Sequence, residues 1–284
     1  MKSLSTIVLL IIVTFAAKAQ VVIPAASPAG SVYTSVGLTD VKIEYSRPRA
    51  KGRKIFGSEP SVIVPFGQIW RTGANQGTFI TFSDDVTVEG TKVPKGQYLI
   101  FSWPGVSEWT ITLYKDVTLG GNTGGYSKDN EVANFKVKSE KLTEKVETLT
   151  ISIGDISDDS KTAKVQIAWE NTSVKFAVKS DFDAKVMKSI EANTKVNSNN
   201  YFQAAVYYLE NGKDLNQALT WMNESIKANP QPQFWMLYQK ARIQKALGDK
   251  KGATETANAS MVSAKQANNR DYQMMNEDLI KSMK

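Results

Sequence analysis

Between residues 31 and 180, apolar and polar side chains alternate with a period of two, which is typical of β-strands that bury one face. Trp109, Ile111 and Leu113 show the alternation clearly. It recurs over residues 41–46, 148–153, 164–169 and 174–179. Turn residues separate these runs, and no helical period lies between them. We therefore predict about eight to ten short strands that form an antiparallel, jelly-roll-like β-sandwich.

Two segments inside this region depart from the alternation. Residues 98–103 are apolar at nearly every position, which predicts a central strand with both faces covered. Residues 119–126 contain two pairs of adjacent glycines. Glycine is conformationally permissive, so we expect a mobile loop there.

After residue 180 the apolar period changes to 3.6, which indicates amphipathic helices. Asp181 or Asp183 can cap the first helix, and Asp214 stands at capping-box spacing from Gln217. The helix ends at Gly212 and Gly248 lie 36 residues apart, close to the 34-residue period of tetratricopeptide repeats. The pattern predicts an all-α region of two such repeats and a capping helix.

Helical repeats of this kind generally present a concave surface to peptides or partner proteins. Two repeats are fewer than the roughly three needed for an independent solenoid, so we expect them to dock on the sandwich or on another protein. The aromatic residues that are candidates for a binding surface are Tyr201, Tyr207, Trp221, Trp235 and Tyr238. Packing within the helical core is the alternative role for them.

The first residues have the features of a cleavable signal peptide: Lys2, an apolar run from Ser5 to Ala17, and small residues before Gln20. The apolar run is shorter than the roughly 20 residues of a membrane-spanning helix. We therefore expect an exported, periplasmic or extracellular protein that does not span the membrane. Its predicted segments are a signal peptide (1–19), an extended lead (20–30), the sandwich (31–180) and the helical repeats (181–284).

The composition excludes several chemistries. The chain has no cysteine, so it forms no disulfide and carries no cysteine-linked lipid. It has no histidine either, which removes His-assisted nucleophiles and the usual transition-metal ligand sets. We expect no metal and no cofactor, and we assign no catalytic residue. The net charge of +7 comes mainly from dispersed lysines, so we expect no nucleic-acid partner.

Several short blocks resemble a known family. They are Tyr45-Ser46-Arg47-Pro48, residues 51–57 (KGRKIFG), Pro65-Phe66-Gly67, residues 70–75 (WRTGAN) and residues 95–98 (KGQY). In this order they resemble an exported bacterial family known as domain of unknown function 2911, over roughly residues 25–180. The resemblance implies a fold but transfers no catalytic residue.

The first candidate site is a basic loop. Five cations fall within residues 47–54, and Pro48 and Gly52 hold the segment open. The guanidinium groups of Arg47, Arg49 and Arg53 could grip the carboxylates or phosphates of an acidic polymer. The alternative is a solvated loop in which one or two of these arginines stabilise the domain through internal salt bridges.

The second candidate site lies in residues 70–75. Trp70, Arg71, Thr72 and Asn75 combine an aromatic ring, a guanidinium, a hydroxyl and an amide. Such a set suits recognition of a carbohydrate or a carboxylate. The same block would also serve to hold the fold, with Trp70 in the core and Asn75 bonded to the backbone.

Three functions remain open. The leading hypothesis is a non-enzymatic envelope module, in which the sandwich binds a ligand or a partner and the repeats contact a protein or peptide. The second is a hydrolase that cleaves a carbohydrate or an ester with carboxylates of the sandwich. The third is a structural accessory protein whose basic loop binds an acidic surface polymer.

Overall fold

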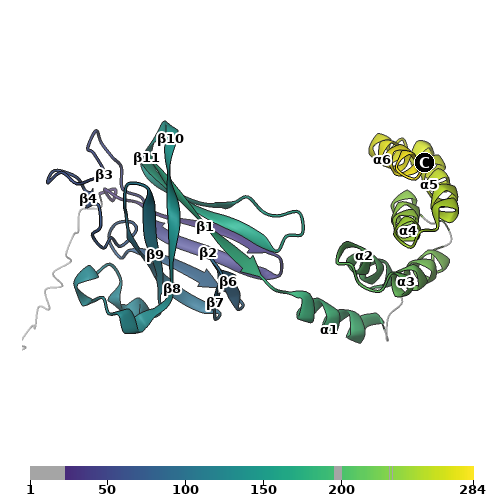
Figure 1. Cartoon of the computed structure of the whole chain (residues 1–284), viewed down its shortest axis with the longest axis horizontal. Coiled ribbons are helices and arrows are strands. Elements are labelled where there is room, and N and C mark those ends of the chain that lie inside the picture. The colour runs from purple at the N-terminus through teal and green to yellow at the C-terminus, as the bar shows by residue number, and fades with distance from the viewer. Residues whose placement is uncertain (1–22, 195–199, 230, 232) are drawn as a thin grey trace, which may run out of the picture.

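The computed structural model describes residues 23–194, 200–229, 231 and 233–284. The predicted signal peptide and the first residues of the predicted lead segment lie outside this part of the chain. Within it, no helix has both the length and the apolar character to cross a membrane. Strands occupy the chain up to residue 180, and helices follow from residue 183 (Figure 1). The predicted fold class, an antiparallel sandwich followed by a helical region, is confirmed.

Nine strands of the described residues form the sheet, in the order β1-β2-β5-β8-β9-β10-β11-β6-β7. Their bounds are β1 Ala29–Val36, β2 Thr39–Ser46, β5 Thr78–Phe82, β6 Val86–Val88, β7 Thr91–Val93, β8 Gly96–Trp103, β9 Glu108–Tyr114, β10 Glu131–Gly154 and β11 Thr162–Ser180. All neighbours are antiparallel. The short strands β3 (Phe56–Gly57) and β4 (Val64–Pro65) form a separate parallel pair.

The sheet folds back on itself, so that β2 meets β10. The Tyr45 hydroxyl accepts a hydrogen bond from the backbone N–H of Ile151 at 2.9 Å. Just beyond β2, Arg49 and Thr148 form an isolated antiparallel bridge. These contacts bring two layers together around one core, into which the alternating side chains of each strand project.

Strand β8 is covered on both faces, as its sequence predicted. Ile100 belongs to the main core, whereas Leu99 and Phe101 join Tyr114 in a second cluster on the opposite face. The glycine-rich segment covers this second cluster with three short 3-10 turns, η1 Val117–Leu119, η2 Thr123–Gly125 and η3 Lys128–Asn130. We expected residues 119–126 to form a mobile loop; in the structure, Leu119 and Tyr126 of this segment pack onto the sheet.

Two strands are much longer than the sequence indicated. We expected separate strands over residues 164–169 and 174–179, but both belong to β11, which has 19 residues. Glu170 interrupts the alternation with a φ of +55°, so the strand bends without ending. Its partner β10 has 24 residues, and its pairing register shifts between Lys141 and Thr150.

In the described part of the chain, six α-helices follow the sheet. Their bounds are α1 Asp183–Thr194, α2 Tyr201–Glu210, α3 Leu215–Lys227, α4 Phe234–Ala246, α5 Lys250–Gln266 and α6 Arg270–Lys281. Helices α2 and α3 pack together as a hairpin, α4 and α5 form the next, and α6 packs on α5. Asp214 caps α3 as predicted, because its carboxylate accepts hydrogen bonds from the backbone N–H groups of Asn216 and Gln217.

Helix α1 lies between the sheet and the other five helices (Figure 1). On the sheet side, Lys185 forms an ion pair with Asp84 at 2.6 Å. On the helical side, Asp183 accepts hydrogen bonds from the Tyr207 hydroxyl and from Lys213 Nζ. Helix α1 therefore connects the two regions through charged contacts at its N-terminal end.

Candidate functional site

Trp70 lies in the core of the sandwich. Its side chain is only 8% exposed, and its indole N–H donates a hydrogen bond to the Gly73 carbonyl at 3.1 Å. Phe56, Trp109 and Trp169 surround its ring at centroid distances of 5.7, 6.0 and 5.9 Å. Because both the ring and the polar atom are occupied inside the protein, this position favours the fold-holding role that we considered for Trp70.

The rest of the block makes internal contacts as well. Thr72 is completely buried, and its hydroxyl lies 2.9 Å from that of Ser102. Asn75 donates from its amide to the Ser46 hydroxyl and to the Ser27 carbonyl. It thereby ties the segment before β1 to the end of β2.

Arg71 also bonds within the block. It is half-buried, and its Nη1 donates to the Asn75 carbonyl at 3.1 Å. The structure thus brings the four residues of the second candidate site together, but their polar groups bond to backbone carbonyls and to the hydroxyls of Ser46 and Ser102.

In the basic loop, the three arginines have different surroundings. Arg53 donates to the carbonyls of Arg49 and Ala50, so its guanidinium closes its own loop. Arg47 is half-buried, and its side chain packs closely on Gly30: a Cβ at position 30 would lie only 2.7 Å from it. Arg49 is exposed, and no described residue pairs with its side chain. The three groups therefore do not converge on one point.

A groove of about 690 Å³ lies between α1 and the α2–α3 hairpin. We call it the aromatic groove, after three of its side chains. Its lining consists of Met187, Lys188, Ile190, Glu191, Thr194, Tyr201, Tyr208, Gln217 and Trp221. The volume falls within the range of roughly 300–1,000 Å³ that is typical of ligand sites.

Helical spacing places the three rings on one wall of the groove. Tyr201 and Tyr208 are seven residues apart on α2 and thus share a face. Trp221 reaches the same wall from α3: its ring lies 4.8 Å from that of Tyr208 and 6.5 Å from that of Tyr201, between centroids. All three side chains are partly exposed.

The polar atoms on these rings have no hydrogen-bond partner in the described part of the chain. None of its residues accepts a hydrogen bond from the Trp221 indole N–H or from the hydroxyls of Tyr201 and Tyr208. In the described chain, the buried side-chain atoms that lack a hydrogen-bond partner belong to other residues. The three ring atoms are therefore accessible to a ligand. The wall therefore offers three accessible donors next to apolar ring surface.

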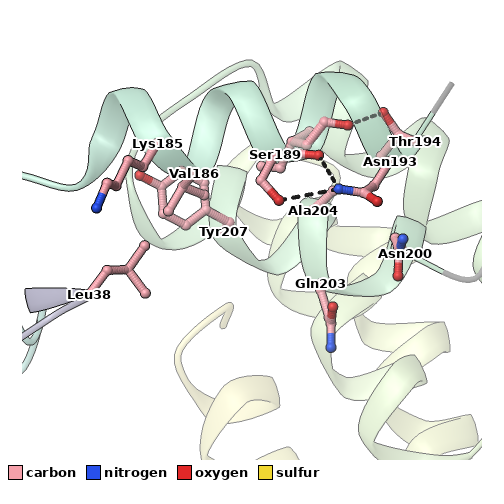
Figure 2. Close-up of a pocket in the computed structure, with 11 residues that line it drawn as sticks. Leu38, Lys185, Val186, Ser189, Asn193, Thr194, Asn200, Gln203, Ala204 and Tyr207 are labelled. Carbon is pink, nitrogen blue, oxygen red and sulfur yellow. Dashed lines mark hydrogen bonds between the residues drawn. The ribbon is translucent and has the colours of Figure 1, made fainter. Parts of the chain in front are cut away.

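A second groove of about 530 Å³ lies on the other side of α1, and we call it the amide groove. Figure 2 shows Asn193, Asn200 and Gln203 along it, with Ser189 accepting a hydrogen bond from the Asn193 amide. Ile190 and Thr194 line both grooves. Helix α1 thus touches α2 along a narrow seam, with open space on either side.

The aromatic set expected from the sequence is only partly correct for this groove. Tyr201 and Trp221 line it, but Tyr207 points to the amide groove and bonds Asp183. Trp235 and Tyr238, on α4, line neither groove. Tyr208 was not in the expected set, although its seven-residue spacing from Tyr201 indicates a shared face. Its ring packs against the core of the hairpin and also lines the groove.

A family model described as "Protein of unknown function (DUF2911)" matches residues 27–178. No curated protein and no solved structure matches the chain. The matched residues cover the sheet almost completely and end before α1. The described lining of the aromatic groove therefore lies outside the family model, whereas the amide groove includes one matched residue, Leu38.

Proposed function

The chain belongs to the family of unknown function DUF2911, which accounts for its sheet, and we propose that it is a non-enzymatic protein-binding module whose ligand site is the aromatic groove. In this proposal the protein is exported, the sheet is the scaffold, and the helices form tetratricopeptide-like repeats that take a peptide segment of an envelope or extracellular partner.

The observation that carries the proposal is the incomplete burial of α1. Thr194 is the one buried residue of this twelve-residue helix. Its larger apolar side chains, Val186, Met187 and Ile190, stay half-exposed and line the two grooves. Covering apolar surface is worth roughly 25 cal/mol per Å², so a segment that fills the aromatic groove would gain free energy from α1 and from the three rings.

The hydrolase alternative has less support from the geometry. Three carboxylates of the sandwich each pair with a lysine on the surface: Glu44 with Lys42, Glu108 with Lys136, and Asp84 with Lys185. In each pair the acid faces a cation, whereas glycoside hydrolysis requires two acids on either side of the scissile bond.

Binding of an acidic polymer by the basic loop remains a second candidate, supported by exposed Arg49. The loop is partly neutralised, however. Lys54 pairs with Glu59 at 2.5 Å, and Glu147 accepts a hydrogen bond from the backbone of Lys51. Adjacent acids weaken the attraction to a polyanion, so we rank this function below peptide binding.

The test is a selection from a random peptide library on the chain from residue 20 onward, followed by affinity measurements on the enriched peptides. We expect Trp221→Ala to weaken binding by about tenfold or more, because buried tryptophans dominate interface energies. Trp235→Ala is the matched control, since Trp235 is 38% exposed on α4 and lies outside both grooves. If no peptide is enriched, or if Trp221→Ala binds as tightly as the parent, the proposal fails.

A further inference from the structure

We propose that the occupant of the aromatic groove is a proline-rich segment in the polyproline II conformation. This inference rests on the proposed function, because it names the kind of peptide that the groove takes. Three properties of the groove support it: the hydrogen-bonding character of its wall, the spacing of its tyrosines and its charge.

The wall can donate hydrogen bonds from Trp221, Tyr201 and Tyr208, and no described residue uses these donors. An indole N–H can only donate. A polyproline II segment has no internal hydrogen bonds, so its carbonyls are free to accept, while its prolines have no N–H that would need an acceptor. Ligand and wall are therefore complementary. An α-helical ligand would leave the donors unused, because its carbonyls are bonded within the helix.

The tyrosine spacing agrees with the same ligand. Tyr201 and Tyr208 are separated by seven residues of α2, which corresponds to a rise of about 10.5 Å at 1.5 Å per residue. One turn of polyproline II is three residues, or about 9.3 Å. Prolines on one face of the ligand would thus meet both tyrosines in turn, and Trp221 would lie beside them.

The charge of the lining fits an uncharged segment. Among the described residues that line the groove, Lys188 and Glu191 are charged, and their charges are opposite. This described lining consequently has no net charge to complement an acidic or basic peptide. A segment composed largely of proline carries none either.

The inference can be tested on the chain from residue 20 onward with blocked decaproline, by titration followed through tryptophan fluorescence. The comparison ligand is a blocked leucine–serine peptide of the same length, which is apolar enough to enter the groove but is not held in polyproline II. We expect decaproline to bind at least about tenfold more tightly than the leucine–serine peptide. We expect Tyr208→Phe, which keeps the ring and removes one donor, to weaken decaproline binding by about three- to tenfold.

The variants and ligands separate this inference from the proposed function. Loss of decaproline binding in Trp221→Ala, with retention in Trp235→Ala, would support both. If the leucine–serine peptide binds as tightly as decaproline, or if Tyr208→Phe has no effect, the polyproline inference is overturned while peptide binding stands. If neither peptide binds and library selection also yields none, both proposals are overturned. A neutral oligosaccharide that binds where decaproline does not would likewise overturn the inference.

Discussion

The indole rings of Trp70 and Trp169 lie nearly parallel in the core, with 5.9 Å between centroids and 19° between planes. Trp169 comes from β11, whereas Trp70 lies in a loop and pairs with Ser102 of β8 in an isolated β-bridge. The contact thus joins an irregular segment to a strand nearly one hundred residues away. Phe56 packs edge-on against both indoles and connects the β3–β4 pair to the same cluster.

The first prediction concerns this cluster. Trp70 is only 8% exposed, so Trp70→Ala removes a buried ring and leaves a cavity among Phe56, Trp109 and Trp169. We expect a loss of about 3–5 kcal/mol in the free energy of unfolding, measured with urea. Trp235→Ala, at an exposed site, should cost less than about 1 kcal/mol. A Trp70→Ala protein of unchanged stability that had lost a ligand would instead show that Trp70 is a binding residue.

The second prediction separates two arginines of the basic loop. Arg53→Ala removes hydrogen bonds to the carbonyls of Arg49 and Ala50, so we expect the free energy of unfolding to fall by about 1–2 kcal/mol. Arg49→Ala removes an exposed side chain without a described partner and should change it by less than about 0.5 kcal/mol. Equal stabilities for the two variants, measured by urea unfolding, would contradict the loop-closing role of Arg53.

The sequence predicted the strand-rich and helical regions because burial follows the alternation directly. Val41 and Ile43, which the period of two placed on an inner face, are both completely buried. It did not predict that residues 164–179 form one strand. A turn and a bend both interrupt the alternation, so the sequence pattern does not distinguish them. In the structure, Glu170 has a positive φ that bends the strand, and the chain continues in the same strand.

The role of the 70–75 block could not be decided from sequence for a different reason. Whether Trp70 meets solvent or Trp169 depends on how β8 and β11 are brought together, and no local pattern encodes that. The sequence did not predict the aromatic groove for a similar reason. Its wall combines Tyr208 from α2 with Trp221 from α3, and their proximity of 4.8 Å depends on how the two helices pack.

The third prediction concerns the turn between β1 and β2. Gly37 has a φ of +57°, and a Cβ at this position would lie 2.2 Å from the Phe182 ring, just before α1. Gly37→Ala should therefore lower stability by about 1–2 kcal/mol from the backbone and by a further 1–3 kcal/mol or so from overpacking. Gly90→Ala is the control, because Gly90 also has a positive φ but no atom within 4 Å. Gly90→Ala should lower the free energy of unfolding only by the amount that the positive φ costs an alanine.

A double mutant sharpens this test. If the clash with Phe182 is the cause, Phe182→Ala should relieve the extra cost of Gly37→Ala, and the two free-energy changes should not add. Additive changes would show that Gly37 acts only through its backbone conformation.

The last prediction is a pH dependence at the junction of α1 with the hairpin. Hydrogen bonds from Lys213 and then from Tyr207 hold the pKa of Asp183 below its ordinary value. A lowered folded-state pKa means that Asp183 stabilises the fold above the unfolded pKa of about 3.9, and that this contribution disappears as the pH falls through the still lower folded pKa.

Asp183→Asn should accordingly be less stable than the parent at pH 7, and the difference between the two proteins should shrink as the pH falls below about 4. Urea unfolding at a series of pH values from neutral to acidic measures this difference directly. Asp158→Asn is the matched control, because Asp158 is exposed in the turn between β10 and β11, and it should show no comparable change. The assignment requires the stability gap of Asp183→Asn to close in acid. A gap that stayed constant from neutral to acidic pH would mean that the carboxylate charge of Asp183 does not hold α1 against α2 and Lys213.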